Sequence, residues 1–328
     1  MAASFDASRL TVTGEPVSLT DRGSEFSVSS NGVLVYRPAS TRQLVWVDRE
    51  MKEIEQLPIR GFLRFRRLSH DGRRLAAAVP DRLTGSTDIW VYDLITHRGI
   101  PLTSHPADEI APVWSPDDER IVFTSNRKGR FDVYETASNG SGHEKVIYES
   151  DASKGVGSWS LDGHHLIFNT DGQAKGEMWS LSLPERRATP LFDSSFLLWD
   201  GQISPDGRVV AYMSDEADGR HEVYIRPFPS GRKSRVSTSG GRWPKWGPGG
   251  KQLFFFADDT RTVMAVDVNT SGGYTVGKPQ ALFSLPISFT DAWFNTPDGQ
   301  RFLFAKPIPG ERSDALTLVQ NWLALLRH

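Results

Sequence analysis

The 328-residue sequence contains no cysteine. The chain therefore has no disulfide, no thiol nucleophile and no thiolate metal ligand, although this absence identifies no cellular compartment. Long apolar runs are also missing, so we expect no direct insertion into a membrane. The start, Met1 to Phe5, has neither a basic region nor an apolar core, and we expect no secretory signal in this chain.

An excess of charge of one sign is absent as well. The sequence has 38 Lys and Arg against 40 Asp and Glu, a net charge of −2. No global basic field would attract a polyanion, so we expect no nucleic-acid partner. Because no Pro-, Gly- or Ser-rich linker and no long charge run interrupts the chain, we expect a single domain over residues 1–328.

The sequence does contain a repeat. Seven small polar turns of the form Ser-x-Asp-Gly stand between short apolar runs at intervals of 40 to 49 residues; they begin at Ser29, Ser69, Ser115, Ser160, Ser204, Gly247 and Thr296. The Asp side chain bonds the backbone two residues on, and Gly supplies positive φ. A fixed period in this range, with strands between the turns, is typical of a β-propeller.

The third repeat shows the unit most clearly, with β-branched and aromatic runs at 111–114, 120–124, 131–135 and 145–148. Four strands per repeat make one blade. We therefore predict an all-β fold, a seven-bladed propeller of four-stranded antiparallel blades, with six or eight blades as alternatives. The expected blades are 20–60, 61–104, 105–150, 151–194, 195–239, 240–284 and 285–328.

The last repeat has no fourth strand of its own. Its third strand is expected at Leu316–Gln320, and the chain ends soon afterwards at His328. Residues 5–19 echo the outer-strand region 266–283, so we expect 5–19 to form the strand that completes the last blade. Such a closure would remove an exposed sheet edge that invites aggregation.

Two of the repeats resemble a known family. Val113–Phe123 (VWSPDDERIVF) and Ile203–Tyr212 (ISPDGRVVAY) resemble the WD40-like repeat of TolB-type propellers. With Leu44–Arg49, Thr296–Leu303 and the final Asn321–Trp322, the chain is also similar to propellers at the C-terminal end of bacterial receptor-like serine/threonine kinases. The resemblance implies an extracytoplasmic or periplasmic sensor or scaffold.

Catalytic signatures are scarce. No kinase motif is present, and Gly272–Lys278 resembles a phosphate loop except that Pro279 replaces the required hydroxyl residue. His164 and His165 point to opposite faces of a strand and cannot chelate one ion together. His221 is more interesting because charged residues flank it. We assign no catalytic residue, no metal ligand and no cofactor.

Propeller geometry indicates where a ligand would bind. Each inner strand begins on one face and ends at its Ser-x-Asp-Gly turn on the other, so we expect binding at the face opposite the turns. The candidate ligand-binding residues are Glu25, Arg64, Glu109, Lys154, Trp199, Asp200, His221, Arg242, Trp243 and Asp291. Mixed charges with two aromatics suit a peptide, a sugar or a charged small molecule better than a lipid.

Three functions remain open from the sequence. The first is a non-enzymatic propeller, a sensor or scaffold that binds a protein, peptide or glycan. The second is a polysaccharide lyase or metal-dependent hydrolase, with His221 or Glu109 near the axis. The third is the accessory propeller of a peptidase or kinase. Fold alone does not choose among them.

Overall fold

The computed structural model describes residues 5–6, 11–12, 23–29, 31–38, 41–81, 84–171, 176–192, 194–271, 273–286, 290–296, 298–308 and 317–321. The chain divides into two compact units. The smaller comprises residues 1–42, 60–62 and 307–328, and the larger comprises 43–59 and 63–306. Nowhere in these described ranges is there a helix long and apolar enough to cross a membrane.

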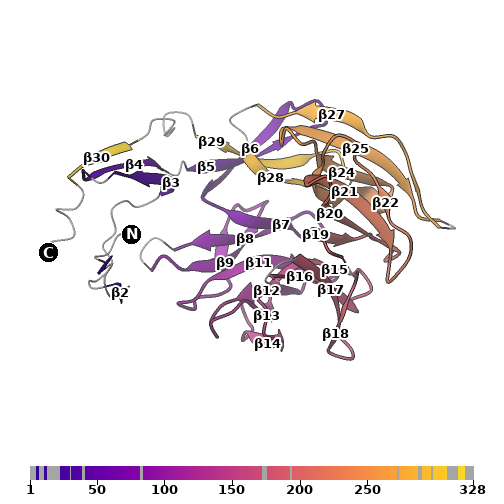
Figure 1. Ribbon diagram of the computed structural model, residues 1–328, viewed down its shortest axis with the longest axis horizontal. Coiled ribbons are helices and arrows are strands. Elements are labelled where there is room, and N and C mark those ends of the chain that lie inside the picture. Colours follow the sequence, from indigo (N-terminus) through magenta and orange to yellow (C-terminus); the bar gives the residue numbers. More distant parts are fainter. Residues whose placement is uncertain are drawn as a thin grey trace. The chain divides into compact units, whose positions relative to one another are not determined.

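Antiparallel sheets make up the larger unit (Figure 1). Four of them follow the chain directly. They are β7 (Arg64–Leu68), β8 (Arg74–Pro80), β9 (Thr87–Asp93) and β10 (Gly99–Pro101); β11 (Glu109–Trp114), β12 (Arg120–Ser125), β13 (Asp132–Ala137) and β14 (Lys145–Tyr148); β15 (Lys154–Trp159), β16 (His165–Asp171), β17 (Gly176–Ser182) and β18 (Arg187–Pro190); and β19 (Leu198–Ile203), β20 (Val209–Ala217), β21 (Arg220–Pro227) and β22 (Ser234–Arg235).

Two further sheets complete the larger unit. One contains β23 (Arg242–Trp246), β24 (Gln252–Phe256), β25 (Thr262–Asn269), β26 (Thr275–Val276) and β27 (Gln280–Ser284). The other has the order β28-β29-β5-β6 and combines β28 (Thr290–Asn295) and β29 (Phe302–Pro307) with β5 (Arg42–Val47) and β6 (Glu53–Gly61). Strands from the two ends of the chain therefore share one sheet.

The smaller unit contains two small sheets. β3 (Gly23–Val28), β4 (Val33–Pro38) and β30 (Thr317–Gln320) pair in the order β3-β4-β30. β1 (Phe5–Asp6) pairs with β2 (Thr11–Val12).

Apolar clusters join each sheet of the larger unit to the next. One cluster links the β7–β10 sheet to the β11–β14 sheet, and the next links β11–β14 to β15–β18. Two more link β15–β18 to β19–β22 and β19–β22 to β23–β27. A fifth cluster joins β23–β27 to the combined sheet, and a sixth joins the combined sheet back to β7–β10. The six clusters therefore form a closed cycle, which is how a propeller buries its apolar surface.

The predicted all-β propeller with antiparallel four-stranded sheets is confirmed, as is the combination of N- and C-terminal strands in one sheet. The strands that the N-terminal part contributes are β5 and β6, however, rather than residues 5–19. Of that segment the structure describes Phe5–Asp6 and Thr11–Val12, which pair with each other, and the rest lies outside the described residues. Likewise β30, expected in the last blade, pairs with β4.

The physical reason lies in the burial of β5. Its residues Leu44 to Val47 are all at most 3% exposed, on both faces of the strand. Such a strand needs a neighbouring sheet on each side, and the combined sheet provides this, with Val45 and Val47 in one apolar cluster and Leu44 and Trp46 in the other. Against the seven expected blades, the described residues form six propeller sheets, so the seven-blade count is not confirmed and the blade boundaries stay predictions.

The Ser-x-Asp-Gly turns have the geometry that the sequence predicts. In the second copy, Ser69 Oγ donates to Asp71 Oδ1 at 2.5 Å and accepts from the backbone N–H of Arg74 at 2.9 Å. Gly72 has φ of 69°. Each such turn closes the hairpin between the first and second strands of its sheet, so the turns lie at the ends of the inner strands.

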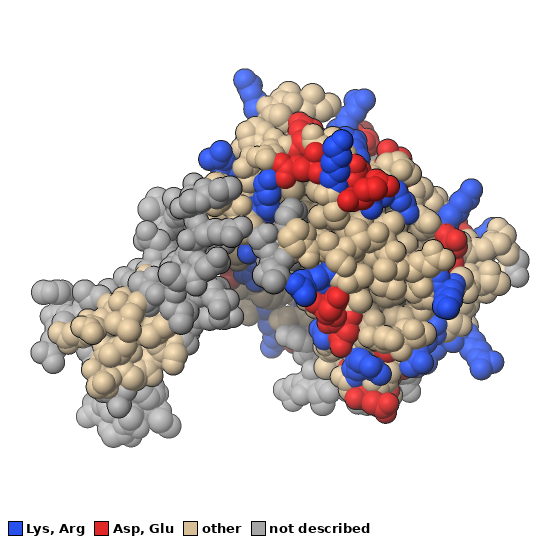
Figure 2. All heavy atoms as spheres, turned by 90° about the horizontal axis from the view of Figure 1, so that it is seen from above, with Lys and Arg blue, Asp and Glu red and all other residues tan. Residues whose placement is uncertain are grey.

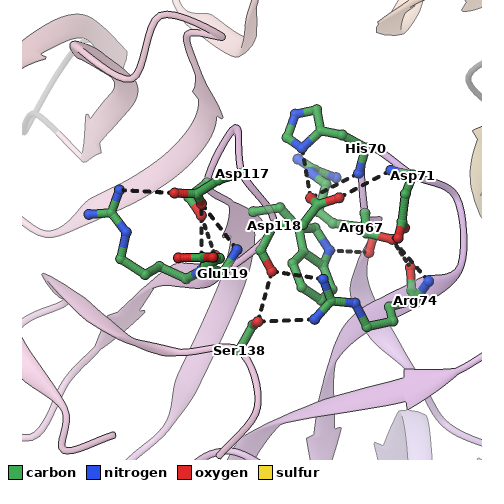
Figure 3. A network of polar contacts seen from close by, with 12 residues as sticks. Arg67, His70, Asp71, Arg74, Asp117, Asp118, Glu119 and Ser138 are labelled. Carbon is green, nitrogen blue, oxygen red and sulfur yellow. Dashed lines mark hydrogen bonds and ion pairs between the residues drawn. The ribbon is translucent and has the colours of Figure 1, made fainter.

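The third copy departs from the pattern because Asp118 stands where Gly is usual, at φ of 57°. Its carboxylate accepts hydrogen bonds from the backbone N–H groups of His70 and Asp71, at 2.9 and 3.1 Å, and Nδ1 of His70 lies 2.8 Å from it (Figure 3). Burial alone would raise the pKa of Asp118, but these hydrogen bonds hold it below its ordinary value. The side chain thus ties the third turn to the second.

Arg74 reinforces the same junction. Its guanidinium donates to the carbonyl oxygen of Asp118 at 2.8 Å and to Ser138 Oγ at 3.0 Å (Figure 3). It also lies over the ring of Trp114, 4.7 Å from the centroid. Trp114 is itself 2% exposed, as expected for an aromatic that packs between blades.

The closure predicts a sharp contrast within β6. Leu57 is fully buried in the cluster between the combined sheet and β7–β10, whereas Ile54 on the same strand is 51% exposed. We expect Leu57→Ala to lower the free energy of unfolding by about 2–5 kcal/mol and Ile54→Ala by less than about 0.5 kcal/mol. Urea denaturation measures both. Equal, small effects would show that β6 does not complete this sheet.

Candidate functional site

Inner strands of the larger unit share a backbone irregularity. The pairing registers of β7, β11, β19 and β23 shift near their middle, as in β-bulges. At corresponding positions Phe65, Ala111, Asp200 and Trp243 have positive φ, between 47° and 54°. For bulky residues this conformation is strained, and such strain is concentrated at functional sites, where bulges redirect side chains.

These irregular residues line one cavity of about 380 Å³, which we call the bulge cavity. Its lining comes from four neighbouring sheets and from β23. The residues are Phe65, Arg67, Ala111, Gly155, Val156, Gly157, Asn169, Trp199, Asp200, Met213, His221 and Trp243. The volume lies in the range of small-ligand pockets, and the lining combines aromatic faces with a few polar groups.

The aromatic side chains of the bulge cavity are held at defined angles. Trp199 meets the ring of His221 edge to face at 5.1 Å, and Trp243 meets Phe256 in the same way at 5.7 Å. Phe65 is 40% exposed, with the guanidinium of Arg64 5.3 Å from its ring centroid. Apolar contact surface is therefore already presented to a ligand, at little cost in side-chain ordering.

His221 contributes a neutral imidazole. Burial, and then the positive charge of Arg242, lower the pKa of His221 from 6.5. The ring is therefore uncharged at pH 7. Its Nδ1 is buried and has no hydrogen-bond partner among the described residues. A neutral imidazole donates through one ring nitrogen and accepts through the other, so His221 can form a hydrogen bond with a ligand.

Of the ten residues proposed from the sequence, Trp199, Asp200, His221 and Trp243 line the bulge cavity together. Arg64 is exposed beside Phe65, and Arg242 lies 3.5 Å from the carboxylate of Asp258. The side chains of Glu25 and Asp291 lie outside the described residues.

Glu109 and Lys154 begin inner strands as expected, but both are buried at 0% and 3% exposure. Lys154 Nζ lies 2.5 Å from Asp132 Oδ1 and donates to the carbonyl oxygen of Ser150 at 2.9 Å. Glu109 pairs with Arg127, which also pairs with Glu144. These contacts tie the starts of the inner strands to nearby strands and loops.

Phe65, Arg67, Asn169 and Met213 line the bulge cavity but were not proposed from the sequence. Phe65 occupies the same place in β7 as Trp243 in β23, with the same left-handed backbone. Aligning the inner strands by their final residue would therefore have identified it. Asn169 and Met213 come from the second strands β16 and β20, in which the sequence analysis proposed no ligand-binding residue.

A second cavity, of about 580 Å³, opens at the turns, and we call it the turn cavity. Its rim includes the second residues of five turns, His70, Pro116, Leu161, Pro205 and Pro248. Arg67, Gln202 and Lys245 also line it, and Arg67 borders the bulge cavity as well. The sequence analysis expected binding at the opposite face, yet the larger of these two cavities lies at the turns.

The described residues contain no group of three or more His, Asp or Glu side chains that could hold a metal ion. On the face shown in Figure 2, Lys and Arg side chains are interspersed with Asp and Glu. This face therefore presents no field of a single sign, in keeping with the net charge of −2.

Comparison with known proteins finds similarity to TolB-like propellers. Residues 58–197 match the family model for the PD40 TolB beta propeller domain. The structure superposes on a protein of Agrobacterium tumefaciens described as TolB with a TM-score of 0.65, 18% identity, and coverage of 83% of this chain and 99% of that one. This similarity shows the fold alone.

Two further proteins are similar to this chain. An oligogalacturonate lyase in complex with manganese superposes with a TM-score of 0.54 and 16% identity, over 92% of this chain and 83% of that one. Tricorn protease homolog 1 of Streptomyces coelicolor is 28% identical over 169 residues, 49% of this chain. The chain spans between 14% and 36% of the length of the curated relatives it matches.

Burial of Glu109 predicts a pH effect on stability. Burial raises the pKa of Glu109 from 4.5 to about 7, with Arg127 only partly opposing the shift. Between these two values the native state binds more protons than the unfolded chain, so the free energy of unfolding falls as pH rises from about 4.5 to 7.

Glu109→Gln removes the ionisable carboxyl, and with it this fall in the free energy of unfolding. From pH 5 to pH 8 we expect the stability of the variant to rise by about 1–3 kcal/mol relative to the natural chain. Urea denaturation at both pH values measures the change. Glu149→Gln is the control, because Glu149 pairs with Lys128 at the surface. A stability difference that does not vary with pH would contradict the assigned burial of this carboxyl.

Proposed function

We propose that this TolB-like β-propeller binds a peptide segment of a partner protein in the bulge cavity, without turnover. The observation that carries the proposal is the convergence of Phe65, Trp199 and Trp243, from three different sheets, on one cavity. Tryptophan and arginine are the side chains most enriched at the centres of protein interfaces. Arg67 and Asp200 in the same lining provide charged groups that orient a ligand.

The backbone of the cavity supports a binding role. The backbone of Phe65 and of Trp243 has a strained, left-handed conformation near the start of its inner strand. A peptide side chain that enters between them meets aromatic surface already fixed by the sheets, so little ordering cost arises on binding. A glycan is the alternative ligand, since sugar rings also stack on aromatic faces.

We also propose that the propeller ring is complete with six blades, the combined sheet being the blade that closes it. The cycle of six apolar clusters supports this count. The role as an extracytoplasmic sensor or scaffold rests on the sequence resemblance to kinase-associated propellers. The relationship to a tricorn protease homologue supports an alternative, the accessory propeller of a peptidase.

The lyase or hydrolase alternative would place its chemistry at His221. Resemblance to an oligogalacturonate lyase in fold supports it. The bulge cavity contains one carboxylate among its described lining, Asp200, and one imidazole, His221. The rest of the described lining is mostly aromatic and apolar, apart from Arg67 and Asn169, and such a lining favours ligand binding over acid–base catalysis.

Substitution of the aromatic residues tests the binding proposal. A peptide selected from a displayed random library against the whole chain serves as ligand, and calorimetry measures its affinity. We expect Trp243→Ala to weaken binding about 30-fold or more, as loss of a central aromatic anchor does. Phe65→Ala should weaken it in the same direction. Phe196→Ala is the matched control, since Phe196 is 43% exposed and does not line the cavity.

Circular dichroism establishes that the variants are folded. Unchanged affinity in both folded cavity variants would place the peptide site elsewhere. Cleavage of a peptide or polysaccharide by the natural chain, lost on His221→Ala, would favour the enzymatic alternative.

A further inference from the structure

The third Ser-x-Asp-Gly turn departs from the repeat in a way that the fold does not require. The fourth residue of other turns is glycine, with φ between 65° and 79° at Gly72, Gly163, Gly207 and Gly299. Asp118 occupies that position in the third turn at φ of 57°, a conformation that glycine adopts at lower cost. A residue kept in a costly conformation points to a function of its side chain.

The carboxylate of Asp118 orients one imidazole. Nδ1 of His70 lies 2.8 Å from Asp118 Oδ1, and the backbone N–H groups of His70 and Asp71 donate to Oδ1 and Oδ2 (Figure 3). Burial alone would raise the pKa of Asp118, but these hydrogen bonds lower it, so the carboxylate is an ionised acceptor. In the neutral ring of His70 the proton is therefore on Nδ1, and Nε2 carries the lone pair.

Nε2 of His70 is available to a ligand. No hydrogen bond joins it to a described residue, and the side chain of His70 is 39% exposed. His70 lines the turn cavity of about 580 Å³. Because Asp118 fixes the orientation of the ring, Nε2 accepts a hydrogen bond from one direction. The cavity thus offers an oriented acceptor to an O–H or N–H group.

The rest of the rim is largely apolar. It includes the second residues of the other four turns, Pro116, Leu161, Pro205 and Pro248. Trp114 and Trp159 line the same cavity, and each already donates its indole N–H to a backbone carbonyl oxygen, at 2.9 and 3.1 Å. Proline rings pack well against aromatic rings, as they do where proline-rich segments lie in aromatic grooves. A well-matched ligand therefore combines an aromatic ring with one hydrogen-bond donor.

We propose that the rim of the turn cavity binds a phenol, whose hydroxyl donates a hydrogen bond to Nε2 of His70 and whose ring contacts the proline and leucine side chains. A phenol has an apolar aromatic body and a single polar tip, which matches this rim. The phenol is either the tyrosine side chain of a partner segment or a free phenolic compound. Asp118 is a positioning residue, because it acts through His70. Neither the charges of Arg67 and Lys245 nor peptide binding in the bulge cavity is needed for this site.

Two probes that differ by one hydroxyl test the proposal. NMR titration of the whole chain measures the affinities of N-acetyl-tyrosinamide and N-acetyl-phenylalaninamide at pH 8.5, where histidine rings are ordinarily neutral. We expect the tyrosine probe to bind about 3- to 10-fold more tightly, which is the effect of one net hydrogen bond. The tyrosine probe should also shift the nitrogen resonance of His70 Nε2, and the phenylalanine probe should shift it much less.

Variants separate the roles of His70 and Asp118. His70→Phe keeps a ring at the rim but removes Nε2, so the two probes should bind with about equal affinity. Asp118→Gly restores the usual turn residue. The ring of His70 should then populate both neutral tautomers, a spectroscopic change that a purely structural role of Asp118 would not produce, and the preference for the tyrosine probe should shrink. His164→Phe is the matched control, because His164 is exposed and lies outside the cavity lining.

A third probe, 4-methylphenol, identifies the source of the phenol. Tighter binding of N-acetyl-tyrosinamide than of 4-methylphenol indicates a tyrosine side chain, and the reverse indicates a free phenolic compound. The proposal is overturned if the tyrosine and phenylalanine probes bind the natural chain equally or not at all, if the Nε2 resonance does not move, or if folded His70→Phe still prefers the hydroxyl. The first two results need only the natural chain, so the test stands even where a variant fails to fold.

Discussion

The pairing of β29 with β5 is the contact on which the rest of the structure depends. It joins strands that lie more than 250 residues apart in the sequence and makes one sheet out of two half-sheets. Phe302 and Phe304 of β29 and Val45 and Val47 of β5 enter the same apolar cluster. Without this pairing β29 would present an open edge, and two of the six clusters would lose one side.

Closure also determines what the inner strands can do. Each sheet of the larger unit shares an apolar cluster with two other sheets, so both of its faces are packed. The bulges at Phe65, Ala111, Asp200 and Trp243 turn side chains out of the regular ladder and into the bulge cavity. Arg67, two residues after one bulge, borders both cavities. The bulges thus bring aromatic side chains from several sheets around one cavity.

The strands and turns could be predicted because they are local. The strands expected at 120–124 and 131–135 correspond to β12 and β13, and the turn geometry follows from Ser, Asp and Gly. Strand partners could not be predicted, because the chain contains two hairpins, β3-β4 and β28-β29, that could each have paired with β5. Only packing decides that β5 joins β28-β29. Similarly, sequence position identified Trp199 and Trp243, but it could not show that Lys154 meets Asp132 on another strand. The position of a residue in the sequence shows that it lies at the end of a strand. The side chains around it in the fold determine whether it can contact a ligand.

Amide hydrogen exchange of the whole chain tests the central claim, the closure by β5, most directly. The account predicts that the amides of Arg42–Val47 exchange as slowly as those of β12, because both strands lie between two hydrogen-bonded neighbours. The turn that follows, at Arg49–Glu50, should exchange fast. Fast exchange throughout Arg42–Val47, with β29 still protected, would contradict the pairing and the closed ring.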